Sequence, residues 1–248
     1  MVGGTQGLAE NEMQERYLGD SHDFLKYALL RHLNETLGLK LGVNWYLTTP
    51  DEVDRPGNND GEKRHHLKGG VWRDADPGLF EMIGKFDAIA ERKLSNVQAW
   101  GILPVGTCYY AAPVPTDGRR SWHQNAIREL QPADLIFLDP DNGFEVSSMT
   151  ARTRPKYSLF NEAADYVDAG KSVVAIQFAR QCDPIQRAID IRSKLVSLVG
   201  SPADFPVIRG RVAPNLLFFS IVPGANRERW RRALLDFEMN CAKAEIIE

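Results

Sequence analysis

The sequence has few cysteines, little net charge and no long run of apolar residues. Its three cysteines are too few and too widely spaced for a disulfide framework or a Cys-x-x-Cys metal knuckle, which favours a reducing compartment. The formal net charge of -3 lacks the basic excess typical of proteins that bind nucleic acid through many phosphates. No stretch approaches the ~18 apolar residues of a membrane span, and the amino terminus lacks a signal-peptide pattern. We therefore expect a cytoplasmic protein without a membrane segment.

The composition is that of an ordinary globular protein, with 43% hydrophobic and 25% charged residues. We expect a flexible segment over residues 1–15 and a single α/β domain over residues 16–248, because no linker divides the chain. Basic clusters occur at Lys63–Lys68, Arg152–Lys156 and Arg227–Arg232. Such runs are more often solvated faces than binding sites, but they keep RNA or DNA open as a partner.

Helical and strand-like patterns alternate along the chain. Apolar residues at helical spacing predict helices over Asp23–Leu33, Leu79–Ala90, Trp122–Leu130, Asn161–Ala169, Pro184–Leu198 and Arg227–Cys241. Apolar, β-branched and aromatic runs predict strands or extended segments over Gly42–Thr48, Val97–Leu103, Thr107–Val114, Asp134–Leu138, Ser172–Phe178, Pro206–Val212 and Asn215–Val222. This alternation predicts a doubly wound, mostly parallel α/β sheet.

The segment DLIFLDPDNGFE is the sharpest local signal. Its apolar run predicts a central strand, and the residues that follow supply Asp139, Asp141, Asn142 and Glu145 to one turn. Because open α/β sheets bind ligands at the carboxyl ends of their strands, this turn is a candidate reaction site. An Asx-type turn after a core strand is the alternative interpretation.

A second candidate is the start of the first predicted helix. Asp23 and Lys26 are three residues apart and share one helix face, while Gly19 and Asp20 precede the helix, where free backbone N–H groups can bind an anion. The alternative is an ordinary cap beside a weak surface ion pair.

These motifs carry a family resemblance. The segment GDSHDFLKYALLRHL resembles the amino-terminal signature of the bacterial 23S rRNA adenine-N6 methyltransferases, in which a Gly-Asn-x-x-Asp-x-x-Lys-His helix precedes a strand. Gly19, Asp23 and Lys26 match, Asp20 stands for the Asn, and Tyr27 stands for the His. VNWYLTTPDE is similar in placement to that family's first cofactor strand, and DLIFLDPDN to its DPPY strand end.

The resemblance covers most of the chain and implies a Rossmann-like, class I methyltransferase-type fold. It implies S-adenosylmethionine as cofactor and methyl transfer to RNA or another polar acceptor. In DPPY-type enzymes the Asp accepts a hydrogen bond from the target amine and the final aromatic residue stacks on the flipped base. Asp139, Asn142 and Lys26 are then the expected catalytic residues, with Phe144 as the nearest aromatic face. The expected cofactor-binding residues are Gly19, Asp20, Tyr46, Asp51, Asn59 and Asp60.

The chain departs from the usual cofactor pattern after its first predicted strand. A glycine-rich turn is expected there, and the sequence has Thr48–Glu52 instead. Asn58–Gly61 can adopt tight turns and could substitute for it, or could be a plain loop tip. A set of bacterial proteins with the motifs GDxxDFxKY, WYL, NNDG and LDPDNGxE resembles the chain more closely, but that likeness implies no particular activity.

Two other function classes stay open. Clustered carboxylates also suit a Mg²⁺-dependent phosphoesterase or nuclease. Its ligands would be Asp20, Asp23, Asp139, Asp141 and Glu145, although the partner lysine that many nucleases carry on the acidic strand is missing. A relative of the fold that binds a nucleotide or a protein without catalysis is the third hypothesis, and the missing glycine-rich turn favours it.

Overall fold

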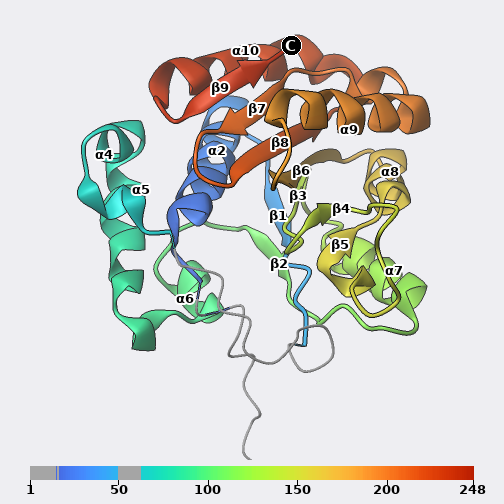
Figure 1. Cartoon of the computed structure of the whole chain (residues 1–248), viewed down its shortest axis with the longest axis horizontal. Helices are drawn as coiled ribbons and strands as arrows, with labels where there is room; N and C mark the ends of the chain where they lie inside the picture. The colour runs from blue at the N-terminus through green and yellow to red at the C-terminus, as the bar shows by residue number, and fades with distance from the viewer. Residues whose placement is uncertain (1–14, 16, 50–62) are drawn as a thin grey trace, which may run out of the picture.

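The computed structural model describes residue 15, residues 17–49 and residues 63–248 (Figure 1). The predicted cofactor residues Asp51, Asn59 and Asp60 lie outside these residues. Seven strands form the central sheet. In spatial order they are β2 (Cys108–Tyr110), β1 (Leu41–Asn44), β3 (Leu135–Leu138), β6 (Ser172–Ala179), β8 (Asn215–Ile221), β7 (Val207–Gly210) and β9 (Ala244–Ile247).

The sheet is mostly parallel, as the sequence predicts. Strands β2, β1, β3 and β6 pair in parallel with their neighbours. Strand β8 pairs antiparallel with both β6 and β7, so β7 runs in the same direction as β6, and β9 is reversed again. A Rossmann-like α/β sheet is therefore present, with a reversed strand inserted near one end. The final strand, β9, was not predicted.

Successive strand residues point to opposite faces, and this divides the core into two clusters. Leu135 and Phe137 of β3 belong to one cluster, whereas Ile136 and Leu138 belong to the other. The first face is covered by α2 (Ser21–Leu37) and α10 (Arg227–Asn240). The second is covered by α7 (Arg119–Glu129), α8 (Phe160–Asp168) and α9 (Pro184–Val199).

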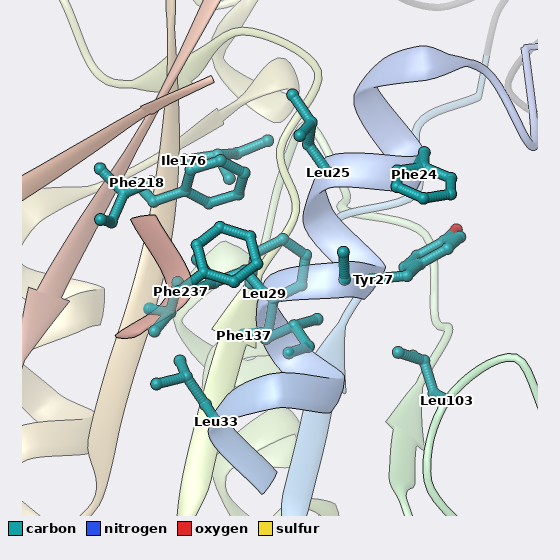
Figure 2. Packing of buried hydrophobic residues seen from close by; sticks show 14 of the residues in the cluster. Phe24, Leu25, Tyr27, Leu29, Leu33, Leu103, Phe137, Ile176, Phe218 and Phe237 are labelled. Carbon is teal, nitrogen blue, oxygen red and sulfur yellow. The ribbon is translucent and has the colours of Figure 1, made fainter. Parts of the chain in front are cut away.

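Helix α2 is the central helix of the first face, and its sequence explains its limits. The Asp20 side chain caps the first turn, and Gly38 ends the helix in a left-handed conformation. Leu25, Leu29 and Leu33, spaced by four, point toward the sheet and α10, as Figure 2 shows. Phe24 and Tyr27 lie on the other side of the helix, where Leu103 is also found (Figure 2).

The connection between β1 and β2 differs most from the predictions. It contains α4 (Val71–Ala75), α5 (Pro77–Ile83) and α6 (Leu94–Ala99). The predicted helix over Leu79–Ala90 ends at Ile83 and continues as short 3-10 turns, because Gly84 follows. The prediction of an extended Val97–Leu103 is wrong, because Val97 packs into the core from a helix; a short apolar run does not separate helix from strand.

The remaining predicted elements are confirmed with shifted ends. The predicted Thr107–Val114 segment contains a strand of only three residues, β2, and α7 begins at Arg119 rather than at Trp122. Beyond the predictions, β4 (Gly143–Phe144) and β5 (Tyr157–Ser158) form a small parallel pair beside the main sheet. Among the described helices, none is long and apolar enough to cross a bilayer.

Candidate functional site

The candidate site lies where the strand order reverses. Strand β1 pairs with β2 on one side and with β3 on the other. The chain adds β2 to one side of β1 and then crosses to the other side to add β3. In open α/β sheets this switch point, at the carboxyl ends of the strands, is where ligands bind. The carboxyl end of β3 supplies Asp139 here, and that of β1 supplies Trp45 to Thr48.

Three of the predicted residues form a buried charge cluster at this edge. The Lys26 Nζ atom lies 3.0 Å from Asp23 Oδ1 and 2.9 Å from Asp139 Oδ1. Their side chains are only 10%, 11% and 11% exposed, respectively. The Asp23–Lys26 pair is therefore not the weak surface pair of the alternative interpretation, because it is buried and also binds the end of β3. The N-terminal helix motif and the acidic turn form one site.

The electrostatics of the cluster follow from its burial. Burial raises the pKa of Asp139 to about 6; Lys26 opposes that shift and Asp23 adds to it. Burial likewise raises the pKa of Asp23, again against the effect of Lys26. Although burial acts in the opposite direction, the two carboxylates raise the pKa of Lys26 above its ordinary value. Lys26 thus stays charged, and the pKa of Asp139 lies at about 6.

The start of α2 does not offer the free N–H groups that were expected. The Gly19 N–H donates to Asp23 Oδ2 at 2.9 Å, and the Asp20 side chain accepts from the N–H groups of His22 and Asp23. The Ser21 N–H donates to the Lys63 carbonyl. These groups of Gly19 and Asp20 therefore cap the helix itself, and the predicted contact of Gly19 and Asp20 with a cofactor stays a prediction.

Asp20 also pairs with His22, which was not among the predicted site residues. His22 Nδ1 lies 3.2 Å from Asp20 Oδ2, and His22 Nε2 is 2.9 Å from the Pro214 carbonyl oxygen. Although burial opposes it, hydrogen bonding and charge from His22 hold the pKa of Asp20 below its ordinary value. Asp20 thus holds the ring of His22, and His22 ties α2 to the β7–β8 connection.

The acidic turn after β3 is anchored from two sides. The Asp139 N–H donates to the Asn44 carbonyl of β1 at 3.0 Å, and Thr48 Oγ1 donates to Asp141 Oδ2 at 3.2 Å. On the other side, Gln177 of β6 donates through Nε2 to the Asn142 carbonyl and accepts from the Phe144 N–H. The turn is thus a fixed element of the sheet edge rather than a loose Asx turn.

Gly143 explains why the turn can lie so close to β6. Its φ is +93°, and a Cβ placed there would lie 2.7 Å from the Gln177 side chain and 2.8 Å from Gln177 Cα. Only glycine fits both the conformation and the close approach. Gln177 was not among the predicted site residues, although a lone amide inside the apolar run SVVAIQF was the available signal.

Tyr46 does not face the cofactor region as predicted. Its side chain is fully buried, and its hydroxyl donates to Glu162 Oε2 at 3.1 Å. Glu162 is in turn paired with Arg119 at 2.7 Å, so Tyr46 is held between α7 and α8. Its φ of +49° turns the chain after β1, which sends the Tyr46 ring to one face of the sheet.

Two further expectations at the acidic turn are corrected. Phe144 is fully buried, stacked on Phe160 with ring centroids 4.7 Å apart, so it cannot present an aromatic face to a substrate. Glu145 Oε1 accepts the Phe160 N–H at 2.9 Å and so serves the start of α8. A partly exposed aromatic ring near this turn is instead Phe178, at the end of β6.

The carboxylates of the metal hypothesis do not converge. Lys26 Nζ lies between Asp23 and Asp139, in the position that a bridging cation would take. Within residues 17–49 and 63–248, no group of three or more His, Cys, Asp or Glu side chains is arranged to hold a metal ion. Mg²⁺ dependence stays a prediction without a ligand set in this part of the chain.

The residues at the edge fit an adenosyl cofactor in part. Asp23, Asp139 and Asp141 outnumber Lys26 at this edge, and this excess of carboxylates suits a sulfonium cation. Residues 111–113, which follow β2, contain no carboxylate to hold ribose hydroxyls. Such a carboxylate would have to come from elsewhere, and the predicted Asp51 lies outside the described residues.

Comparison with known proteins adds no assignment. No protein-family model matches the chain, and no curated protein is significantly similar to it. The function therefore has to be argued from the geometry of the site.

Proposed function

We propose that this protein transfers a methyl group from S-adenosylmethionine to an amine on RNA or another polar acceptor. The observation that carries the proposal is the buried contact between Lys26 of α2 and Asp139 at the end of β3. It unites, at the switch point of the sheet, the two motifs on which the resemblance to adenine-N6 methyltransferases depends.

Asp139 has the chemistry that such a reaction requires. Lys26 contacts Oδ1 of Asp139, so Oδ2 is the oxygen available to accept a hydrogen bond from a target amine. When the amine nitrogen forms its bond to the methyl carbon, the carbon–sulfur bond breaks and the nitrogen must lose a proton. A carboxylate with a pKa of about 6 is suited to receive that proton near neutral pH.

Lys26 and Asp23 act on Asp139 rather than on the acceptor. Lys26 fixes the orientation of the Asp139 carboxylate, and Asp23 holds Lys26 from the same helix face at 3.0 Å. The Asp139 N–H is bonded to Asn44, so both backbone and side chain of Asp139 are held. This preorganisation keeps the accepting oxygen in place while charge develops on the amine.

Calorimetric titration of the full-length protein with S-adenosylhomocysteine tests the cofactor. We expect micromolar binding by the wild type and by Asp139→Asn, and tritium transfer from labelled S-adenosylmethionine to bulk cellular RNA by the wild type. Transfer should fall at least about a hundredfold in Asp139→Asn.

Asp134→Asn is the matched control, because Asp134 precedes the same strand at its opposite end and is exposed. It should retain both binding and transfer. An absence of adenosyl binding by the wild type contradicts the proposal, as does full transfer by Asp139→Asn.

A further inference from the structure

The end of β6 presents a cation and an aromatic ring beside the reacting carboxylate. Phe178 is partly exposed, and the Arg180 guanidinium carbon lies 5.1 Å from its ring centroid, with Arg180 itself exposed. The His22 ring also contacts Phe178 in a T-shaped arrangement, with the two ring centroids 5.3 Å apart. None of these three residues has a part in the chemistry proposed for Asp139.

Strand register places Phe178 on the same face as Asp139. Leu138 pairs with Ala175, so β6 continues four residues beyond the end of β3 and Phe178 stands above the acidic turn. Phe178 packs with the cluster on the α2 face, whereas its neighbour Gln177 points the other way and anchors the turn.

Two residues of helix α2 contact Phe178 and Asp139 from the same side. His22 and Lys26 are four residues apart and so lie one above the other on the helix. His22 contacts Phe178, and Lys26 contacts Asp139. On this face, Asp139 therefore lies at the end of β3, and Phe178 lies farther out, on the part of β6 that extends beyond β3.

Exposed cations flank the same turn. The basic segment Arg152–Lys156 lies against it, because the Asn142 N–H donates to the Lys156 carbonyl at 3.0 Å and β4 pairs with β5. Arg152 and Arg154 are exposed, as is Arg180 on the other side. The carboxylates are thus central and the guanidinium groups peripheral, a distribution that fits a ligand with an uncharged ring and outer phosphates.

We propose that Phe178 and Arg180 form a stacking site for a base of single-stranded RNA, with Arg180 and the Arg152–Lys156 segment binding the flanking phosphates. This names the acceptor class for the site of the proposed function and rests on that proposal for its position beside Asp139. An exposed cation–aromatic contact is weak, so a base can replace the guanidinium on the ring while Arg180 turns to a phosphate. Phe178 takes the stacking position for which Phe144 is too deeply buried.

Fluorescence anisotropy with a labelled 12-nucleotide oligoadenylate RNA tests the proposal on the full-length protein. We expect wild-type binding at low salt, about tenfold weaker binding by Phe178→Leu, and binding close to wild type by Phe178→Trp, which keeps a stacking surface. Arg180→Ala should weaken binding and reduce the slope of log affinity against log salt by about one.

A second cation–aromatic pair supplies the matched control. Arg73 lies 4.8 Å from the ring of Phe80 on α5, away from the sheet edge. Phe80→Leu and Arg73→Ala should bind the RNA like the wild type. Equal losses at both pairs, or no wild-type binding, overturn the proposal.

S-Adenosylhomocysteine titration of the same variants separates this proposal from the proposed function. Phe178→Leu should bind it with wild-type affinity, which also shows that the variant is folded. Wild-type RNA binding by Phe178→Leu contradicts the stacking site and leaves methyl transfer standing. The reverse outcome is RNA binding that depends on Phe178 while the wild type binds no S-adenosylhomocysteine. In that case the stacking site stands and the proposed methyl transfer fails.

Discussion

Replacing Lys26 by methionine tests the central feature of the site, which is one buried cation shared by two buried carboxylates. Methionine is unbranched like lysine, with a side chain one heavy atom shorter, and it carries no charge. Removing one partner of a buried ion pair costs about 3–5 kcal/mol of unfolding free energy when the other partner stays charged. The carboxylates can avoid that cost by binding protons, so the effect of Lys26→Met should depend on pH.

The size of the effect follows from the distance. Two unit charges 2.9 Å apart interact by on the order of 6 kcal/mol at an effective dielectric constant of about 20, or about four pKa units. Because Lys26 also serves Asp23, we expect a smaller rise for Asp139, from about 6 in the wild type to above about 8 in the variant.

The sign of the pH dependence is fixed by the direction of these shifts. In the wild type the pKa of Asp139 is raised above its ordinary value of 3.8, so its contribution to stability is complete below that value and is lost as pH rises through about 6. In Lys26→Met the loss continues to higher pH. Between pH 6.5 and 8, Asp139 should lower the unfolding free energy of the variant by about 1.4 kcal/mol per pH unit beyond any wild-type change.

Urea unfolding followed by tryptophan fluorescence at pH 6.5, 7.2 and 8.0 measures this difference. Lys68→Met is the control, because Lys68 is exposed on a short 3-10 turn, and it should change stability by less than about 0.5 kcal/mol at every pH. A gap between Lys26→Met and wild type that stays constant from pH 6.5 to 8.0 refutes the reasoning. It would mean that Lys26 does not hold a titrating carboxylate in its charged form.

Two other predictions concern the same edge of the sheet. The rate of methyl transfer should fall as pH drops through about 6, since protonated Asp139 cannot accept a proton; a rate that is flat from pH 5 to 8 at saturating S-adenosylmethionine contradicts this role. Gly143→Ala should lower the unfolding free energy by about 3 kcal/mol or more, because it adds a contact 2.8 Å from Gln177 Cα to the strain of a positive φ. Gly170→Ala, at φ +78° with nothing within 4 Å, should cost only about 1–2 kcal/mol in the same urea titration.

Local patterns were sufficient to predict much of the architecture. Buried strands such as Ser172–Ala179 are continuous apolar runs, and helices such as Pro184–Val199 have apolar residues at helical spacing. The limits of α2 depend on residues adjacent in sequence, namely the cap at Asp20 and the left-handed glycine at Gly38. The β1–β2 connection was predicted poorly, since its short helices gain their stability from packing against α2 rather than from a long periodic pattern.

The sequence by itself determined which chemistry the protein carries: the Asp-x-x-Lys face of one helix and the acidic turn after one strand. Tertiary structure decided which of those groups meet. The contact between Lys26 and Asp139 spans more than a hundred residues and exists because β3 pairs beside β1 under α2. Tyr46 and Phe144 were predicted as site residues but are fully buried. Phe178 reaches the edge because β6 extends beyond the end of β3. Strand register and helix packing determine such placements, and the spacing of neighbouring residues does not predict either of them.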